Sequence, residues 1–226
     1  MKLVIIVPAY NEGKVIYGVL KSLPKKIDGI SKIEVVVVND GSQDNTQQQA
    51  QKTKLKTLNH VVNRGLGAAI KTGLHYAQNC NADAALTFDS DGQHNPKDIQ
   101  NVIQPIIAGQ ADLVIGSRFK KSQKIPVDRL ILNWLANIAT LILFGITSTD
   151  TQSGFRAFSK KAINHIDYKS DRMEFSSEIL VEAKKHKLQI LEVPVNAIYT
   201  DYSRNKGQKN TNAISIFSKY LIRLLR

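Results

Sequence analysis

The chain can be interpreted outward from one segment, Leu86-Thr87-Phe88-Asp89-Ser90-Asp91-Gly92-Gln93-His94-Asn95-Pro96. The apolar residues from Ala84 to Phe88 predict a short buried strand. Two aspartates follow at alternate positions, and Pro96 opens a helix at a position where its missing N–H costs nothing. Open α/β sheets bind their ligands at the carboxyl ends of the strands. The segment therefore predicts a ligand site at the end of a buried strand.

The two aspartates of this segment, Asp89 and Asp91, also predict a metal ion. Neighbouring carboxylates repel each other unless a cation neutralises them, and hard oxygen ligands suit Mg²⁺ or Mn²⁺. Such an ion commonly takes one or two carboxylates from the protein and completes its shell with substrate phosphates. The alternative is a strand-to-helix turn in which Asp91 and Gly92 serve only the turn geometry.

Length and composition are those of one large α/β domain. The chain has 226 residues, of which 42% are hydrophobic and 22% charged. This length suits one large domain better than two full domains. The single cysteine, Cys80, cannot form an internal disulfide, which favours a reducing compartment. Because Met1-Lys2 lead directly into a strand pattern, we expect no signal peptide.

The net charge of +12 predicts an anionic partner. Nucleic acid, an anionic membrane leaflet and phosphorylated substrates all fit this sign of charge. The basic residues are scattered along the chain, and no aromatic–basic binding motif is present. We therefore expect no nucleic-acid partner.

Buried strands alternate with helical patterns through the first half of the chain. Strands are expected at residues 2–7, 33–38, 57–62, 84–88 and 112–116, and a polar cluster follows each. This alternation predicts a doubly wound, mostly parallel α/β sheet with helices on both faces. Ser42 or Asp44 is expected to cap the helix after the second strand. Since each polar cluster follows a strand, the clusters should meet on one rim of the sheet.

The pattern changes beyond Lys120. A helix from Val127 to Ile146 is apolar nearly all round but is interrupted by Asn133, Asn137 and Thr140. These interruptions favour an interfacial or partner-facing helix over a transmembrane one, and a helix buried in the core is the alternative.

The remaining part is expected to alternate short elements and loops. A polar turn at 150–155 leads into a short strand, a helix covers 175–186, and two edge strands at 188–199 are broken at Pro194. A loop at 204–210 precedes a basic amphipathic helix at 214–226. That terminal helix suggests contact with a membrane surface, and an ordinary docking helix is the alternative.

Together these clusters resemble the family 2 glycosyltransferases of the GT-A fold, and within them the polyprenyl-phosphate sugar synthases, of which dolichyl-phosphate mannose synthase is the familiar type. The matching segments come in the family's order and span nearly the whole chain. They are Pro8-Ala9-Tyr10-Asn11-Glu12, Asn39-Asp40-Gly41-Ser42, Asp89 to His94, Gly116-Ser117-Arg118, and Asp150-Thr151-Gln152-Ser153-Gly154-Phe155-Arg156. Two departures are visible. Asn39 stands where the family usually has a first aspartate, and the transmembrane helices that many relatives append are absent.

The resemblance implies a nucleotide-diphosphate sugar, GDP- or UDP-linked, as donor. The residues implied in donor binding are Pro8, Tyr10, Glu12, Asp40, Asp89, Ser90 and Arg204. Within this set, Asp40 would contact the base or ribose, and Arg204 would close over the phosphates or else be a solvated loop charge. Asp89, Asp91 and Gln93 would hold Mg²⁺ or Mn²⁺, which stabilises the leaving diphosphate.

The acceptor decides the mechanism. A hydroxyl acceptor needs a general base, for which Asp150 is the candidate. A polyprenyl monophosphate is already largely ionised near neutral pH and needs cations instead. Arg118 and Arg129 match the positions where the lipid-phosphate branch carries such arginines. Asp91, Arg118, Arg129 and Asp150 are therefore the expected catalytic residues, and a single displacement would invert the anomeric centre.

The resemblance thus implies an inverting, metal-dependent glycosyltransferase in one domain. Residues 1–120 would bind the donor, and residues 121–226 would face the acceptor and the membrane. We expect a cytoplasmic protein bound peripherally to the inner membrane face, with polyprenyl phosphate, anionic lipid and a small membrane protein as candidate partners. The alternatives are a saccharide hydroxyl acceptor in cell-surface polysaccharide synthesis, or an inactive membrane scaffold. The intact Asp89, Asp91 and Gln93 disfavour the scaffold.

Overall fold

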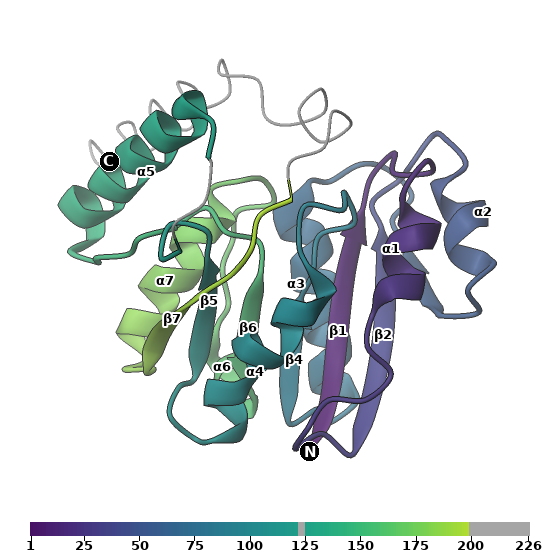
Figure 1. Ribbon diagram of the computed structural model, residues 1–226, viewed down its shortest axis with the longest axis horizontal. Coiled ribbons are helices and arrows are strands. Elements are labelled where there is room, and N and C mark those ends of the chain that lie inside the picture. The colour runs from purple at the N-terminus through teal and green to yellow at the C-terminus, as the bar shows by residue number, and fades with distance from the viewer. Residues whose placement is uncertain (122–124, 199–226) are drawn as a thin grey trace.

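A computed structural model describes residues 1–121 and 125–198. In these residues the strands form one seven-stranded sheet with the order β3-β2-β1-β4-β6-β5-β7 (Figure 1). The strands are β1 (Lys2–Ala9), β2 (Lys32–Asn39), β3 (Lys56–Asn59), β4 (Ala84–Thr87), β5 (Leu113–Ser117), β6 (Arg156–Ser159) and β7 (Ile190–Pro194). Only β6, among these strands, runs antiparallel to its neighbours. The predicted doubly wound, mostly parallel sheet is confirmed.

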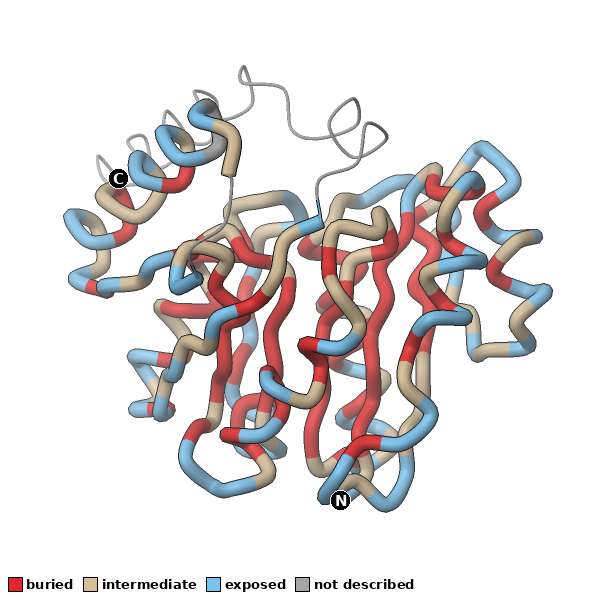
Figure 2. Tube along the Cα trace, in the orientation of Figure 1, coloured by how far each residue is buried: buried red, intermediate tan, exposed pale blue. Residues whose placement is uncertain are grey.

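Helices cover both faces of the sheet because the strand side chains alternate between two cores. Val4 and Ile6 of β1 pack in one core with α3, α6 and α7. Leu3, Ile5 and Val7 pack in the other with α1, α2 and α4, and the strands β1, β4, β5 and β6 are buried along most of their length (Figure 2). The helices are α1 (Ile16–Ser22), α2 (Thr46–Gln51), α3 (Leu66–Asn79), η1 (Pro96–Asp98), α4 (Ile99–Ile107), α5 (Val127–Phe144), α6 (Lys160–His165) and α7 (Phe175–Lys185).

Local hydrogen bonds show which helix starts the sequence indicated. Asn95 accepts a hydrogen bond from the N–H of Lys97, so the turn predicted at Pro96 starts η1 and leads into α4. Asp44 accepts one from the N–H of Thr46, the first residue of α2, whereas Ser42 accepts from Asn11 instead. No helix is predicted from the sequence at 160–165. The structure has α6 there, and Ser159 caps it by accepting a hydrogen bond from the N–H of Ala162.

Two strand predictions were too generous. The third strand ends at Asn59 and not at Val62, because His60 to Gly65 form a loop around Asp40. The predicted pair of edge strands is one strand, β7, which pairs in parallel with β5. After Val195, whose N–H still donates to the carbonyl of Ser117 in β5, the chain crosses toward the segment beyond β4, where Ala197 makes an isolated bridge with His94.

The helix α5 stands beside the sheet at the end where β5, β7 and α7 lie (Figure 1). Its polar residues Asn133 and Thr140 are buried, while Trp134 is 61% and Ile142 is 75% exposed. This reverses the pattern of a core helix and excludes the alternative of a helix buried in the core. None of the helices in the described part of the chain has the length and apolar character needed to cross a membrane. The predicted helix at 214–226 lies outside the described residues.

Candidate active site

A cavity of about 400 Å³ opens at the carboxyl ends of β1, β2 and β4, beside the start of α3. The sequence predicted this location because parallel strands present their carboxyl ends on one rim. Seven predicted site residues line the cavity: Pro8, Tyr10, Glu12, Asp40, Asp89, Ser90 and Asp91. The structure therefore brings together residues that are far apart in the chain, as expected for one site.

Asp40 lies at the end of β2 with its carboxylate directed to the next loop. Its Oδ1 accepts hydrogen bonds from His60 Nδ1 at 2.6 Å and from the N–H of Arg64 at 3.0 Å, and its Oδ2 accepts one from the N–H of Gly65 at 2.7 Å. His60 Nε2 is in turn 2.9 Å from Thr72 Oγ1. Asp40 thus shapes the cavity wall at the N-terminus of α3 as well as lining it.

Asn39, the departure from the family pattern, has a structural role. Its Nδ2 donates to Asn59 Oδ1 at 3.0 Å, and its Oδ1 accepts from the N–H of Ser42 at 3.2 Å. An aspartate at this position could not donate to Asn59. The amide therefore joins the ends of β2 and β3 and fixes the turn that carries Asp40.

Asp89 is paired with His94, a residue with no predicted role of its own. His94 Nε2 lies 2.9 Å from Asp89 Oδ2, and the imidazole packs against the rings of Phe88 and Phe155. Burial pushes the pKa of Asp89 upward, but the hydrogen bond from His94 and the charges of His94, Arg118 and Arg156 outweigh it and lower the pKa. His94 lies within the same segment as Asp89, so its position in the sequence was the available signal.

Asp91 has the opposite electrostatic environment. Burial and the nearby charge of Asp89 raise the pKa of Asp91 to about 6. Gln93 partly compensates through its N–H, 2.9 Å from Asp91 Oδ1, and its Nε2, 2.8 Å from Oδ2. The three predicted metal ligands are therefore adjacent. Ser90 points elsewhere, since its Oγ donates to the carbonyl of Pro8 and joins the ends of β1 and β4.

These residues fit a divalent ion that is shared with a substrate. In the described part of the chain, no group of three or more His, Cys, Asp or Glu side chains has a metal-binding arrangement. Mg²⁺ and Mn²⁺ need fewer, because phosphates of the substrate supply further oxygens. Burial and the charge of Asp89 raise the pKa of Asp91, so its ionised form calls for a compensating positive charge. A cation bound by Asp89, Asp91 and the Gln93 amide oxygen would supply it.

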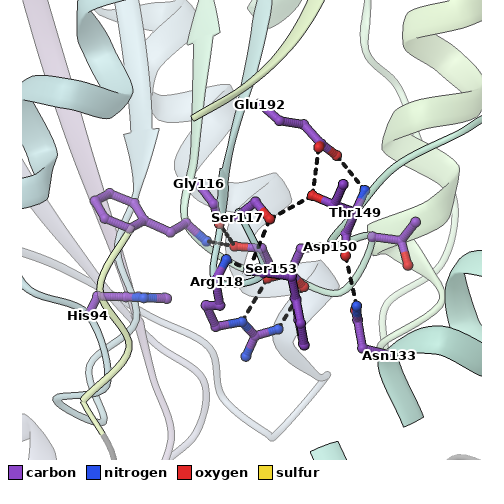
Figure 3. Close-up of polar contacts among 12 residues, drawn as sticks. His94, Gly116, Ser117, Arg118, Asn133, Thr149, Asp150, Ser153 and Glu192 are labelled. Atoms are coloured by element: carbon purple, nitrogen blue, oxygen red, sulfur yellow. Dashed lines mark hydrogen bonds and ion pairs between the residues drawn. The ribbon is translucent and has the colours of Figure 1, made fainter. Parts of the chain in front are cut away.

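Arg118 and Asp150, predicted for two different acceptors, form one ion pair (Figure 3). Arg118 Nε and Nη2 each lie 2.8 Å from an oxygen of Asp150, and the N–H of Arg118 donates to Oδ2 at 3.1 Å. Asp150 is fully buried. Both carboxylate oxygens therefore serve the arginine, which is an arrangement for holding a cation in place and not for accepting a proton from a hydroxyl.

The ion pair adjoins the predicted metal ligands. The charge of Arg118 contributes to the lowered pKa of Asp89. Gly154, four residues after Asp150, packs against the Asp89 carboxylate so closely that a Cβ there would lie 2.6 Å from Oδ2. The carbonyl of Gly154 also accepts a hydrogen bond from Thr87 Oγ1 at 2.5 Å. A donor phosphate at Asp89 and an anion at Arg118 would consequently be neighbours.

Two predicted arginines cannot be placed in the site. Arg129 lies in the first turn of α5, but its side chain is outside the described part of the structure, and Arg204 lies outside the described residues altogether. Conversely, Met173 lines the cavity although no sequence pattern pointed to it. The segment before it is held by Glu178, which accepts hydrogen bonds from the N–H groups of Lys169 and Ser170.

Comparison with known proteins identifies a family and several relatives. Residues 4–167 match the model of glycosyl transferase family 2. The UDP-N-acetylglucosamine–dolichyl-phosphate N-acetylglucosaminyltransferase of Methanococcus voltae is 38% identical over 240 aligned residues, which cover 96% of this chain and 94% of that protein. The dolichol-phosphate mannosyltransferase of Pyrococcus furiosus is 28% identical over 237 residues, covering 100% of this chain and 64% of that protein.

A solved structure shares the architecture. Glucosyl-3-phosphoglycerate synthase from Mycobacterium tuberculosis, in complex with Mn²⁺, UDP-glucose and phosphoglyceric acid, superposes with a TM-score of 0.72 at 16% identity and covers 99% of this chain and 78% of that one. At this identity the likeness concerns the fold, and the predicted GT-A fold is confirmed. The family match extends over most of the chain, from β1 to the end of α6. The chain therefore belongs to glycosyl transferase family 2.

Proposed function

We propose that this protein transfers a sugar from a UDP-sugar to a polyprenyl monophosphate and inverts the anomeric centre. The observation that carries the proposal is the Arg118–Asp150 ion pair beside Asp89. It supplies a positively charged group, and not a free base, where the acceptor must approach the donor. The similarity to transferases named for dolichyl and dolichol phosphate supports the same acceptor class.

The proposed donor occupies the cavity at the strand ends. Pro8, Tyr10, Glu12 and Asp40 would surround the nucleoside, and Asp89, Asp91 and Gln93 would hold Mg²⁺ or Mn²⁺. The ion, when bound, offsets negative charge on the diphosphate and makes it a better leaving group. We choose UDP-N-acetylglucosamine as the first donor to test because a relative that aligns over nearly the whole chain is named for it.

The proposed reaction needs no base. The second pKa of a phosphate monoester is about 6, so the acceptor carries a nucleophilic oxygen at neutral pH. That oxygen forms a bond to the anomeric carbon while the bond from this carbon to the donor's β-phosphate oxygen breaks. The nucleoside diphosphate leaves with the electron pair. Arg118, held by Asp150, would bind the acceptor phosphate through charge-assisted hydrogen bonds.

Peripheral attachment to the inner membrane face is part of the proposal. The exposed apolar side chains of α5 include Leu130, Ile131, Trp134 and Ile142. The net charge of +12 favours an anionic surface. Both features would bring the site to a lipid-linked acceptor.

The test is incubation of the purified protein with radiolabelled UDP-N-acetylglucosamine, UDP-glucose or GDP-mannose, together with polyprenyl phosphate and Mn²⁺. We expect label to move into the organic phase with one UDP-sugar. Label that appears only in a water-soluble saccharide, when saccharide acceptors are added, would show a hydroxyl acceptor and contradict the proposal. Transfer from GDP-mannose alone would contradict the choice of donor.

A further inference from the structure

We infer that Glu192, on the edge strand β7, is a positioning residue that sets the Arg118–Asp150 ion pair for the acceptor phosphate. The inference rests on the proposed function, since it assigns Arg118 to that phosphate. Glu192 lies outside every predicted motif and does not line the cavity. Its side chain is directed to the loop that ends in Asp150 (Figure 3).

The carboxylate of Glu192 binds this loop at three atoms. Its Oε1 accepts hydrogen bonds from Ser148 Oγ at 2.6 Å and from the N–H of Thr149 at 2.8 Å, and its Oε2 accepts one from Thr149 Oγ1 at 2.7 Å. The N–H of Asp150 in turn donates to Ser148 Oγ at 3.2 Å. Glu192 therefore fixes the two residues that precede Asp150, and through Ser148 also the backbone of Asp150 itself.

The same network reaches Arg118 from its other side. Thr149 Oγ1 lies 2.7 Å from Ser117 Oγ, and Ser117 Oγ accepts a hydrogen bond from the N–H of Phe119. An ionised glutamate can only accept, so Thr149 must give its hydroxyl proton to Glu192. Ser117 must then give its own proton to Thr149. The charge of Glu192 thus orients both hydroxyls, and these hold the residues on either side of Arg118.

Helix α5 completes the arrangement. Asn133 Nδ2 and Asn137 Nδ2 both donate to the carbonyl of Thr149, at 2.8 and 2.9 Å. The N–H, the hydroxyl and the carbonyl of Thr149 are therefore all engaged. Thr149 is nevertheless an exposed residue, so burial alone does not keep it in place. Directed hydrogen bonds from β7 and α5 do.

A glutamine at position 192 would preserve the shape but would remove the ion pair with Lys120, whose Nζ lies 3.7 Å from Glu192 Oε2, and would reverse one hydrogen bond. Its oxygen could still accept from Ser148 and Thr149 N–H, but its amide group would face the Thr149 hydroxyl as a donor. Thr149 would then have to donate to Ser117, whose own proton loses its acceptor. We expect the Arg118–Asp150 pair to lose its fixed position while the donor cavity stays unchanged.

The experiment measures the kinetics of the full chain with the donor that the screen identifies and with polyprenyl phosphate. For Glu192→Gln we expect the acceptor KM to rise roughly tenfold, as for loss of one hydrogen bond. The donor KM and the rate of donor hydrolysis without acceptor should stay within twofold of wild type. Thr149→Val should shift the acceptor KM in the same direction, and Thr149→Ser, which keeps the hydroxyl, should restore it.

Glu182→Gln is the matched control. It removes a glutamate of α7 that pairs with Lys185 and His186, away from the loop. A Glu192→Gln enzyme with wild-type acceptor KM, or with donor and acceptor KM raised equally, would overturn the inference. Thermal unfolding of each variant shows whether a loss is only one of stability. Failure of wild type to transfer sugar to polyprenyl phosphate would instead overturn the proposed function, and the inference with it.

Discussion

At the scale of single residues, Asp89 and Asp91 follow the same strand, β4, but have different electrostatic surroundings. Asp89 is compensated by His94 and nearby arginines, so its pKa is lowered. Asp91 is buried beside Asp89, and its pKa rises to about 6. The first carboxylate is thus stabilised as an anion by the fold itself. The second would be compensated by the proposed metal ion.

This difference predicts opposite stability effects in the metal-free protein. A folded pKa above the unfolded value means that ionised Asp91 destabilises the fold, increasingly as pH rises from about 4 toward 6. Asp91→Asn should therefore raise the free energy of unfolding at pH 7.5 by about 1–3 kcal/mol, with little effect at pH 4. Urea unfolding in EDTA at both pH values measures it. Similar changes at both pH values would contradict the prediction.

Asp89→Asn should act in the reverse sense. Because the pKa of Asp89 is lower in the folded state than in the unfolded state, its ionised carboxylate stabilises the fold when the pH is above the unfolded-state pKa. This contribution is lost as the pH falls through the folded-state pKa. The variant should therefore be less stable than wild type at pH 7.5, and the difference should shrink on acidification below pH ~4. The same titration checks it, and a stabilised Asp89→Asn would refute the role assigned to His94.

Metal removal supplies a separate residue-scale prediction. Activity should vanish with EDTA and return with Mg²⁺ or Mn²⁺, because Asp89, Asp91 and Gln93 are the proposed ligands. Mn²⁺ should raise the melting temperature of wild type, since ligands stabilise the state that binds them. Asp91→Asn should lose most of that increase. Full activity in excess chelator would exclude the metal site.

Arg118 and Asp150 should behave as one unit. Arg118→Ala would remove the proposed charge-assisted contact to the acceptor, for which about 1.5–3 kcal/mol is usual. Asp150→Asn leaves the arginine without its ionic partner and should raise the acceptor KM in the same direction. The double variant should cost little more than Arg118→Ala alone, because both changes act on one interaction. Asp150→Asn as the more damaging change, with wild-type acceptor kinetics for Arg118→Ala, would indicate a hydroxyl acceptor.

At the scale of elements, α3 packs through small residues against the sheet beside the cavity that we propose for the donor. Gly73 faces β1 so closely that a Cβ would lie 2.2 Å from Ile6 Cγ2. Gly67, in the first turn, would place a Cβ 2.4 Å from the carbonyl of Ser170. The helix can therefore lie against both the sheet and the segment before Met173. This closeness puts its N-terminus at the cavity.

Gly73→Ala should consequently destabilise the protein. Alanine gains about 1 kcal/mol in helix propensity, but overpacking of a core costs typically ~1–3 kcal/mol. Gly18→Ala in α1 is the matched control, since a Cβ there meets nothing within 4 Å. Urea denaturation should show Gly18→Ala as neutral or stabilising and Gly73→Ala as destabilising. Equal effects would mean that α3 can shift away from β1 at no cost.

At the scale of the whole molecule, charge and apolar exposure both suggest a membrane surface. The chain carries +12, and α5 places Trp134 and Ile142 in solvent. Either signal alone binds weakly, whereas two together can anchor a protein reversibly. The polar side of α5 meanwhile holds the loop of Asp150 through Asn133 and Asn137. Hydrogen bonds thus connect the exposed helix to the proposed acceptor site.

We predict co-sedimentation with vesicles that contain anionic lipid, weakening as salt rises because charges are screened. Trp134→Ala combined with Ile142→Ala should reduce binding at every salt concentration. Val61→Ala is the control, because Val61 is 98% exposed but lies in the loop after β3. Equal binding to neutral and anionic vesicles would contradict the electrostatic part of the prediction.

The sequence by itself determined the fold class of this protein and the edge of the sheet where its site lies. The apolar runs of β1, β2, β4 and β5, each followed by a polar cluster, were enough to predict a parallel sheet and a site on its rim. Such signals are local, since side-chain periodicity and turn chemistry depend on neighbours in the chain. Asn133, Asn137 and Thr140 interrupted the apolar pattern of α5 in the sequence, but only the structure shows that they contact Thr149 and Ser177.

Only the tertiary structure decided how the polar groups pair. Arg118 meets Asp150 across 32 positions of sequence, and Glu192 meets Thr149 across 43. The antiparallel strand β6 lies between β4 and β5. Its position brings Gly154, in the loop between Asp150 and β6, against the carboxylate of Asp89 at the end of β4. Hydrogen bonds and ion pairs are short-ranged and directional, so they depend on which distant segments the packed sheet brings into contact. That is why the sequence predicted Arg118 and Asp150 for two alternative acceptors, a phosphate and a hydroxyl, whereas the fold pairs the two side chains directly.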